Sequence, residues 1–512
     1  MFDQRAVFEK FGIQALNPGA CSAGGVWSPT ADRDLFDAVN PADAKVSARI
    51  AGASAADYEV VIAGALATQK TWRVVPAPRR GELVARIGHL IEENMDGIAA
   101  LVALDTGKSL MEAKGEVREC IDMAAMAAGQ SRMLYGFTQQ SQRARHRMYD
   151  QWLPLGVTGV ISAYNFPAAV WAQNGFLAAI GGNTVVWKPS PKVPLTALGI
   201  QALCNQAMRE MRFEGVFSLF IPGDNETAEL LLADARVAMV SFTGSSRVGH
   251  RVAALVGADL GRRYMLECSG NNGCIVDETA DLALAARSIA FGAVGTTGQR
   301  CTSTRRVIAQ RAIAERLTGL IVQAFTQIKI GDPREADTVV GPLVDGVAVG
   351  HFEEAVRQAV ALGGKIACGG RRIDRPGHYV EATLITGAAP NWPCVQEETF
   401  APIVYLVTYD TLEEAIGIHN GVVQGLASGI HSTNLANIEL FLSAAGSDCG
   451  IAKVNMGTTG ADIGAAFGGE KETGGGRTAG SDAWKGYMRR QSVCINWGGE
   501  SPWDARIKFD AP

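Results

Sequence analysis

The chain has 512 residues, enough for two or three domains, and 47% of them are hydrophobic while 19% are charged. A formal net charge of −5 disfavours bulk attraction to nucleic acid or to an anionic membrane. No run of about 18 apolar residues is present to form a membrane span, and the charged N-terminal stretch lacks the apolar core of a signal peptide.

The 10 cysteines form no CxxC pair and follow no regular spacing. In a chain of this length, that pattern indicates reduced thiols and a cytoplasmic location, not a disulfide framework. The sequence HExxH is absent, and no Cys/His cluster has the spacing of a zinc site. We therefore expect no metal.

The first third of the chain is predominantly helical by its pattern. An Ala-rich segment predicts a helix over 55–75, and an amphipathic pattern predicts one long helix over 81–104. A further helix is expected over 110–134. Residues 143–154 are first polar and then aromatic, which predicts a hairpin arm that leaves the domain.

Strand and helix patterns alternate from residue 156 onward. Strands are expected over 156–162, 183–188, 216–221 and 238–242. Helices are expected between and after them, over 168–180, 195–209, 226–232 and 247–256. This alternation predicts an α/β fold with a doubly wound parallel sheet. A second α/β domain is expected from residue 273 to about 455, with strands over 273–276, 305–309 and 403–407.

The candidate nucleophile is Cys301, in the run FGAVGTTGQRCTST over 291–304. Small, polar and hydroxyl residues surround it, and Gly295 and Gly298 let the backbone turn tightly and approach a ligand. Arg300 would favour the thiolate if its side chain turned toward the sulfur. The candidate base is Glu267, where an apolar, strand-like run ends in a carboxylate and a small-residue turn.

This pair resembles the general base and nucleophile of the aldehyde dehydrogenase superfamily. The resemblance extends along the chain through five further motifs: YNFP at 164–167, WKPS at 187–190, FTGSSRVG at 242–249, EETFAP at 397–402 and AFGGEKETGGGR at 466–477. Within the superfamily, the chain is most similar to the antiquitin type, the α-aminoadipic semialdehyde dehydrogenases. That similarity rests on GQRC at 298–301, SGNN at 269–272, FGGEKETGGGR at 467–477 and GSDAWKGYMRR at 480–490.

The resemblance implies an aldehyde dehydrogenase-like α/β fold in three parts. A Rossmann-type cofactor domain with a parallel sheet would comprise 1–137 and 157–266, and an α/β catalytic domain would comprise 267–479. A small β oligomerisation arm would comprise 138–156 and 480–512, with the tail pairing with the arm of a neighbouring subunit. The implied assembly is a homo-oligomer, a dimer of dimers.

The cofactor site carries no GxGxxG fingerprint. In FTGSSRVGH, however, a strand leads through a Gly/Ser turn into a helix, whose N-terminal N–H groups can bind phosphate. The resemblance implies NAD, with these contacts: Gly244 and Ser245 at the pyrophosphate, Lys188 at the adenosine ribose, Gly223 beside the adenosine, Glu398 at the nicotinamide ribose and Phe400 at the nicotinamide ring. Pro191 stands where many NAD-preferring relatives have an acid, so NADP stays an alternative.

Aldehyde oxidation by hydride transfer needs an sp³ carbon that bears an oxyanion. A Cys301 thiolate that adds to the carbonyl provides this carbon, and Glu267 would activate water to hydrolyse the resulting thioester. The Asn165 amide and the Cys301 backbone N–H are the expected oxyanion donors. The family usually reads Glu-Leu-Gly-Gly at the base, but here Cys268 and Ser269 follow Glu267, which alters the surroundings of the base.

Two charged residues suggest the substrate. Arg300 would bind a substrate carboxylate, and in the antiquitin type the acid that matches Glu119 meets an amino group. Together they predict L-2-aminoadipate 6-semialdehyde, which is in equilibrium with piperideine-6-carboxylate. Walls and backbone donors are expected from Phe166, Trp171, Phe467, Gly460 and Ala461. The alternative interpretation is that Glu119 and its neighbour Glu116 are solvated helix charges.

Two other activities remain open at this point, and a third alternative is a non-catalytic scaffold, against which the intact Cys301, Glu267 and Asn165 argue. One is the oxidation of another aldehyde, of the betaine or γ-amino type. The other is a thioester hydrolase or acyltransferase that uses the same cysteine and glutamate without NAD. The seven histidines are scattered and form no dyad motif, so a Cys–His hydrolase has no evident base.

Overall fold

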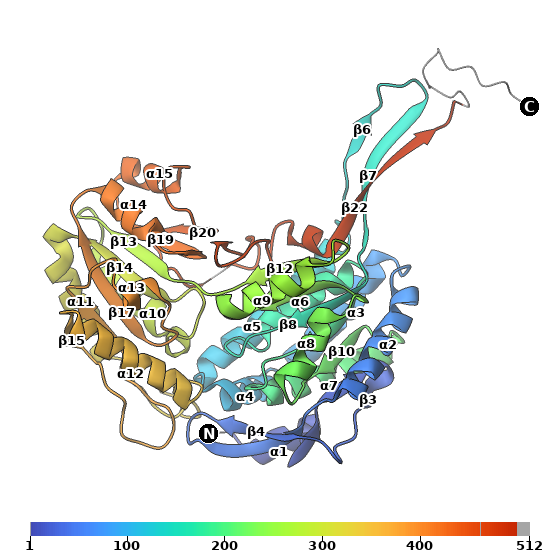
Figure 1. The fold of residues 1–512 in the computed structure, drawn as a ribbon, viewed down its shortest axis with the longest axis horizontal. Helices are drawn as coiled ribbons and strands as arrows, with labels where there is room; N and C mark the ends of the chain where they lie inside the picture. The colour runs from blue at the N-terminus through green and yellow to red at the C-terminus, as the bar shows by residue number, and fades with distance from the viewer. Residues whose placement is uncertain (1, 461, 499–512) are drawn as a thin grey trace, which may run out of the picture.

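The structure is a computed structural model that describes residues 2–460 and 462–498. Two large sheets, each of seven strands, form the body of the molecule, and a thin β arm extends away from it (Figure 1). Buried clusters of apolar side chains lie on the faces of both sheets. No helix in these two ranges is long and apolar enough to span a membrane.

The first sheet has the strand order β12-β11-β8-β9-β10-β2-β3. Its parallel strands are β8 (Val157–Ile161), β9 (Thr184–Lys188), β10 (Phe217–Phe220), β11 (Val237–Thr243) and β12 (Arg263–Glu267). The antiparallel β2 (Ala20–Ser22) and β3 (Val26–Trp27) extend one edge. The chain passes from β8 through β9 to β10 on one side, and then returns to add β11 and β12 on the other. The crevice between β8 and β11 is thus the switch point, where doubly wound sheets bind ligands.

The helices that cover this sheet match the predicted alternation. They are α2 (Ala55–Trp72), α3 (Ala77–Glu93), α4 (Met95–Thr106), α5 (Leu110–Gln130), α6 (Ala169–Ile180), α7 (Pro194–Met211), α8 (Asn225–Ala233) and α9 (Ser246–Gly257). The prediction of one helix over 81–104 was wrong, because α3 and α4 are separate. The backbone leaves the helical region at Asn94 (φ −115°, ψ 16°), and the Asn94 amide donates to the Leu90 carbonyl at 2.7 Å.

The second sheet has the order β15-β16-β17-β14-β13-β19-β20. Its strands are β13 (Asn272–Val276), β14 (Thr304–Gln310), β15 (Lys365–Cys368), β16 (Thr383–Thr386), β17 (Ile403–Tyr409), β19 (Ala427–His431) and β20 (Ile451–Val454). The helices beside it are α10 (Leu282–Val294), α11 (Ala314–Thr326), α12 (Gly346–Ala361), α13 (Pro393–Gln396), α14 (Leu412–Asn420) and α15 (Leu435–Leu442). The three predicted strands are the adjacent central ones, β17, β14 and β13. The missed strands flank them.

The arm consists of β6 (Thr138–Gln140), β7 (His146–Pro154) and β22 (Met488–Asn496). β22 pairs with β7 of its own chain, from Met488 opposite Pro154 to Asn496 opposite His146. The expected pairing of the tail with a neighbouring subunit's arm is therefore corrected for this strand. Residues 499–512 of the predicted tail segment lie outside the described residues.

The remaining elements are small. A three-stranded sheet of β1 (Leu16–Pro18), β5 (Lys45–Ala51) and β4 (Leu35–Asn40) lies near α1 (Gln4–Phe11) at the N-terminal end. A short ladder joins β18 (Gln424–Gly425) to β21 (Glu470–Lys471). This ladder anchors the loop over 466–477 to the second sheet.

Candidate active site

A cavity of about 570 Å³ lies at the switch point of the first sheet. Segments that follow β8, β9, β11 and β12 line it on one side, and the loops at Cys301 and Phe400, together with the start of α12, line it on the other. It brings together nine of the predicted site residues: Cys301, Glu267, Asn165, Lys188, Gly244, Ser245, Glu398, Phe400 and Phe166.

The Cys301 loop is held by close backbone packing. Before it, Thr296 and Thr297 adopt left-handed backbone angles (φ 53° and 55°) although they are not glycines, which costs conformational energy that the surrounding packing must offset. A Cβ on Gly298 would lie 2.3 Å from the Ala401 carbonyl carbon, and one on Gly270 would lie 2.2 Å from the Cys301 oxygen. The Asn272 amide donates to that same oxygen at 2.8 Å. The nucleophile therefore sits on a fixed turn.

The Cys301 thiol is not activated by Arg300. Arg300 Nε donates to Thr296 Oγ1 at 3.0 Å and Nη2 to Glu112 Oε1 at 2.9 Å, so the expectation that this guanidinium favours the thiolate is not met. Burial, followed by the charges of Glu267 and Glu398, raises the pKa of Cys301 to about 12. The thiol thus needs a base to remove its proton.

Glu267 ends β12 and is only 5% exposed. Burial raises the pKa of its carboxyl to about 8, and this effect outweighs the opposing influence of Arg477 and the Gly469 backbone. Neither carboxyl oxygen makes a hydrogen bond of good geometry in the described part of the chain. A Cβ on Gly468 would lie 2.8 Å from Oε1, so the loop over 466–477 packs directly on this group. A buried carboxyl with a pKa near neutrality is suited to general base catalysis.

Asn165 lies in the turn after β8 and is 5% exposed. Its amide nitrogen donates one hydrogen to the Gln299 carbonyl at 2.9 Å, which ties it to the loop that carries Cys301. Gln299 Oε1 in turn accepts from the Val344 N–H at 3.0 Å. The amide nitrogen has two hydrogens, and the second is left to stabilise an oxyanion.

We expect Asn165→Ala to lower kcat by about 10²- to 10³-fold, the usual cost of losing one oxyanion donor. Initial-rate kinetics would measure the change, with binding of the dinucleotide followed by fluorescence as the control. Retention of more than about a tenth of the wild-type kcat would contradict the role of Asn165 in the oxyanion site.

The residues expected at a dinucleotide are arranged to receive one. Ser245 caps the N-terminus of α9, and a Cβ on Gly244 would lie 2.5 Å from the Phe242 ring. Burial lowers the pKa of Lys188 to about 8 and raises that of Glu398 to about 7. Glu398 lies 3.5 Å from Arg305 in an ion pair that is not a hydrogen bond. A helix N-terminus for phosphate, the half-buried Lys188 ammonium and the Glu398 Oε1 oxygen, which makes no hydrogen bond within the described residues, fit the pyrophosphate and riboses of NAD(P).

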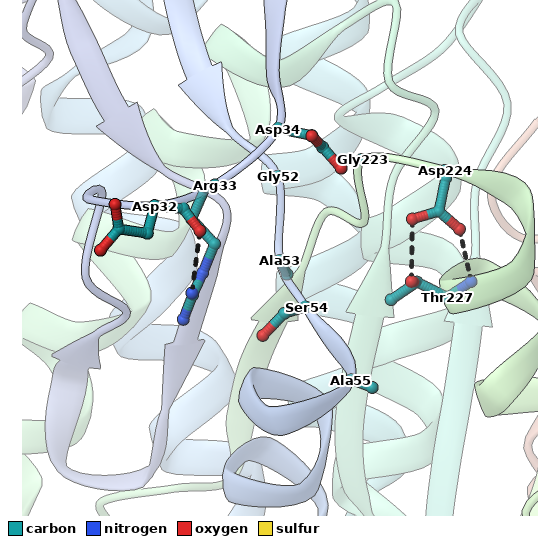
Figure 2. A pocket seen from close by; sticks show the side chains of 10 residues that line it. All are labelled: Asp32, Arg33, Asp34, Gly52, Ala53, Ser54, Ala55, Gly223, Asp224 and Thr227. Atoms are coloured by element: carbon teal, nitrogen blue, oxygen red, sulfur yellow. Dashed lines mark hydrogen bonds between the residues drawn. The ribbon is translucent and has the colours of Figure 1, made fainter.

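Gly223 does not line this cavity. It borders a smaller, polar one of about 350 Å³, which is lined by residues 32–34 and by the starts of α2 and α8 (Figure 2). There, a Cβ on Gly52 would lie 2.5 Å from the Gly223 Cα. The structure thus separates Gly223 from the other expected cofactor residues.

The two helix acids are not solvated. Glu116 is 2% exposed, forms an ion pair with Lys108 and accepts from the Ala168 N–H at 2.8 Å. Glu119 accepts from the Gln173 amide at 2.6 Å, and burial raises its pKa. The alternative interpretation of these residues as solvated charges was therefore wrong for both.

The expected walls behave differently from one another. Phe166 lines the cavity with the Lys108 ammonium 3.5 Å from its ring centroid. The prediction that Trp171 forms a wall of the substrate site was wrong, because Trp171 is 1% exposed and stacks on Trp187 in the core. Phe467 is partly buried against the core under the first sheet.

One of the two expected backbone donors can be located. The Gly460 carbonyl accepts a hydrogen bond from Lys453, and Gly460 does not line the large cavity. Ala461 lies outside the described residues.

Sequence reasoning missed two polar features. The Lys192 ammonium bonds the Asp345 carboxylate at 2.5 Å, which joins the segment after β9 to the start of α12 across the cavity. Lys108, 2% exposed, carries a buried charge next to Phe166. The partners of both lysines are set by the tertiary structure and could not be read from the sequence. The only sequence signal was that Lys192 directly follows the KPSP motif, which placed it near the expected cofactor site.

Comparisons with known proteins agree with this site. The model of the "Aldehyde dehydrogenase family" matches residues 27–493. A putative aldehyde dehydrogenase family 7 member A1 homolog of Caenorhabditis elegans is 43% identical over 98% of this chain and 94% of its own length. The alpha-aminoadipic semialdehyde dehydrogenase of Mus musculus is 40% identical over 99% of this chain and 93% of its own length.

Solved structures share the whole fold. An apo betaine aldehyde dehydrogenase mutant of Staphylococcus aureus superposes with a TM-score of 0.91 at 26% identity, over 99% of this chain and 100% of that one. A 3,6-anhydro-L-galactose dehydrogenase in complex with NAP superposes with a TM-score of 0.89 at 29% sequence identity, over 94% of this chain and 100% of that one. The geometry of the cavity and these matches lead to one conclusion: the chain belongs to the aldehyde dehydrogenase family, whose members oxidise small aldehydes with NAD(P).

Proposed function

We propose that this enzyme oxidises L-2-aminoadipate 6-semialdehyde to 2-aminoadipate with NAD, a step of lysine breakdown. The observation that carries the substrate is a cluster of buried and half-buried charges between α5, α6 and the Cys301 loop. It holds two cations against three carboxylates: Lys108 pairs with Glu116 and Arg300 pairs with Glu112, whereas Glu119 has only the neutral Gln173. A half-buried carboxylate without a cationic partner calls for a cation, and the substrate's ammonium group supplies one.

The other end of the substrate is assigned to Arg300. Its Nε and one Nη2 hydrogen are used by Thr296 and Glu112, and the guanidinium has five N–H donors. The remaining hydrogens can bind the substrate's carboxylate. Support also comes from relatives named alpha-aminoadipic semialdehyde dehydrogenase in mouse, rat and cattle, each 40% identical to this chain.

The chemistry follows from the positions of three side chains. Glu267 takes the Cys301 proton, the sulfur adds to the aldehyde carbon, and the Asn165 amide and the Cys301 N–H stabilise the oxyanion. Lys188, Glu398 and the start of α9 would hold NAD, which would supply the hydride acceptor. Glu267 releases the Cys301 proton to solvent, and as the carboxylate it then takes a proton from a water molecule, whose oxygen adds to the Cys301 thioester and releases the acid and the thiolate.

The comparison of four aldehydes tests the substrate. We expect kcat/KM for racemic 2-aminoadipate 6-semialdehyde to exceed that for betaine aldehyde, succinic semialdehyde and propanal by at least about tenfold, or roughly 1.4 kcal/mol. Equal values for all four would overturn the substrate assignment while leaving the chemistry intact. Preference for betaine aldehyde would favour the alternative of a quaternary or γ-amino aldehyde.

Glu119→Gln should remove that preference selectively. Loss of the negative charge opposite the ammonium group is expected to lower kcat/KM for the aminoadipate aldehyde by about 10- to 100-fold, with propanal changed by less than about threefold. Glu92→Gln, an exposed surface acid, is the matched control. A parallel loss with both aldehydes would assign Glu119 to packing.

For the coenzyme we propose NAD over NADP. Lys192, the cation next to Pro191, is occupied by Asp345 at 2.5 Å and is thus less available to a 2′-phosphate. Comparison of kcat/KM for the two coenzymes tests this. Equal or better use of NADP would contradict it.

We further propose that the β arm, with the residues of the predicted segments 138–156 and 480–512, mediates a homo-oligomer in the cytoplasm. A narrow three-stranded sheet that extends from the body (Figure 1) lacks the packing that small sheets need, which a second copy would supply. All ten cysteines are free thiols, as a reducing compartment would keep them. Sedimentation at several concentrations measures the assembly, and a monomer would overturn it.

A further inference from the structure

A second cluster of metal-ligating side chains lies apart from the large cavity, at the edge of the second sheet. It consists of His419 at the end of α14 and of Asp448 and Cys449 in the segment before β20, with one ligand atom of each within 4.8 Å of the others. Their separation in sequence hides the cluster from any spacing motif. No member lines the catalytic cavity.

The geometry of the cluster matches a tetrahedral zinc site. Bonds of about 2.3 Å to sulfur and about 2.1 Å to nitrogen at a tetrahedral angle place these two atoms about 3.6 Å apart. The observed distance from Cys449 Sγ to His419 Nε2 is 3.6 Å, within hydrogen-bond contact, and the same nitrogen lies 3.1 Å from Ser447 Oγ, so a bound ion would replace both contacts. Asp448 Oδ1 lies 4.0 Å from the same sulfur, and the three ligand atoms all lie within 4.8 Å of one another, so the carboxylate would move closer to share the ion.

The ligands are held in place by their neighbours. His419 is 1% exposed, and its ring packs against Gly273, where a Cβ would lie 2.5 Å from Nδ1. The second Asp448 oxygen is bonded by Lys471 at 2.7 Å, which leaves Oδ1 for a metal. Asn420 bonds the same segment twice, donating to the Gly446 carbonyl at 2.9 Å and accepting from the Asp448 N–H at 3.3 Å. The half-buried Cys449 and Asp448 leave the side open to solvent.

We propose that His419, Asp448 and Cys449 bind one zinc ion or a similar thiophilic divalent cation, with a water molecule at the fourth position. Binding would release the Cys449 proton, because the thiolate is the ligand. Imidazole, thiolate and carboxylate together are ligands that zinc accepts. The site is independent of the reaction proposed for Cys301.

Two features set its expected strength. His419 Nδ1 has no acceptor within residues 2–460 and 462–498, whereas ligating histidines usually donate from that nitrogen, and such an outer bond is worth about 10- to 100-fold in affinity. The Lys471 and Arg306 charges lie close to the carboxylate and sulfur. The site is therefore weaker than a closed structural zinc site.

Its position also suggests a consequence. Gly450, next to Cys449, packs on the loop over 466–477, because a Cβ there would lie 2.0 Å from the Gly468 oxygen. Gly468 in turn contacts Glu267 Oε1. An ion at the cluster would thus stiffen a segment one contact away from the catalytic base.

The test uses Co²⁺ as the probe in the full-length Cys301→Ser protein, which removes the catalytic thiol as a competing ligand. We expect one Co²⁺ per chain, with a thiolate-to-cobalt charge-transfer band and tetrahedral visible bands, and displacement by Zn²⁺. Adding Cys449→Ser should abolish the charge-transfer band and weaken binding at least about tenfold. Asp448→Asn should weaken binding but keep the band.

Cys368→Ser, a half-buried thiol outside the cluster, is the matched control and should change neither band nor affinity. Circular dichroism and melting temperature check that each variant is folded, and Cys449→Ser replaces a partly exposed side chain, so it should fold. The inference is overturned if the band persists in Cys449→Ser, if Cys368→Ser removes it, or if the parent shows no thiolate band.

Discussion

Replacing Cys301 with alanine is expected to lower aldehyde oxidation by at least about 10⁴-fold, or about 5 kcal/mol of activation free energy. Without the sulfur no tetrahedral oxyanion forms at the aldehyde carbon, and a hydride has no adduct to leave from. NADH formation under saturating substrate measures the change, while quenching of protein fluorescence by NAD checks that the cavity still binds its coenzyme.

Cys268 provides the matched control for that experiment. It lines the same cavity and lies one residue from Glu267, but burial raises its pKa to about 12 and its sulfur points toward Gly249, where a Cβ would lie 2.4 Å away. Cys268→Ala should keep kcat within about threefold. Loss of activity in Cys268→Ala with retention in Cys301→Ala would exchange the two assignments.

Glu267→Gln is expected to slow both halves of the reaction. The amide can take a proton neither from Cys301 nor from water, so steady-state turnover falls by about 10²- to 10⁴-fold. Rapid mixing should show no fast burst of NADH, because the Cys301 thiol keeps its proton; a full burst with an acyl-enzyme visible by intact-protein mass spectrometry would limit the role of Glu267 to thioester hydrolysis. The control is Glu470→Gln, an acid on the nearby loop that pairs with Arg477 at 2.6 Å and should change turnover by less than about threefold.

The pH profile gives an independent check of the same residue. Burial raises the pKa of the Glu267 carboxyl to about 8, so the group is protonated and inactive as a base below that pH and ionised above it. Turnover should therefore rise with pH up to about 8 and then level off. In Glu267→Gln, this rise of turnover with pH should disappear. A profile that is flat between pH 6 and 9 in the wild type, or unchanged in the variant, would contradict Glu267 as the base.

Much of the fold was predictable because its signals are local. The alternation of apolar strands with amphipathic helices over residues 156–256 fixed a parallel, doubly wound sheet, and the observed strands β8 to β11 and helices α6 to α9 agree with the expected ranges within about two residues. The missed strands β16, β19 and β20 are short. The predicted strands β8, β9 and β10 are equally short, so length alone does not explain the difference; those strands lie in a run of regularly alternating strand and helix patterns, which supports each of them.

In the active site, too, the features with local sequence signals were predictable and those that depend on packing were not. Cys301, Glu267 and Asn165 could be named from their motifs, because each follows a strand or turn whose sequence is itself diagnostic, and parallel strands bring such ends to one edge of a sheet. Their pKa values could not be named, since burial is the first cause for both Glu267 and Cys301 and burial is a property of the packed molecule.

Charge pairing was decided by the tertiary structure alone. The sequence places Arg300 beside the nucleophile, but the fold turns its guanidinium to Glu112 and leaves Glu119 as the carboxylate without a cation. It also buries Trp171 in the core, separates Gly223 from the large cavity and brings His419 to Cys449. Local sequence determines which element a residue belongs to and where that element ends. The tertiary structure determines which side chains pair with one another. A side chain contacts the elements against which its own helix or strand packs, and those elements come from distant parts of the chain.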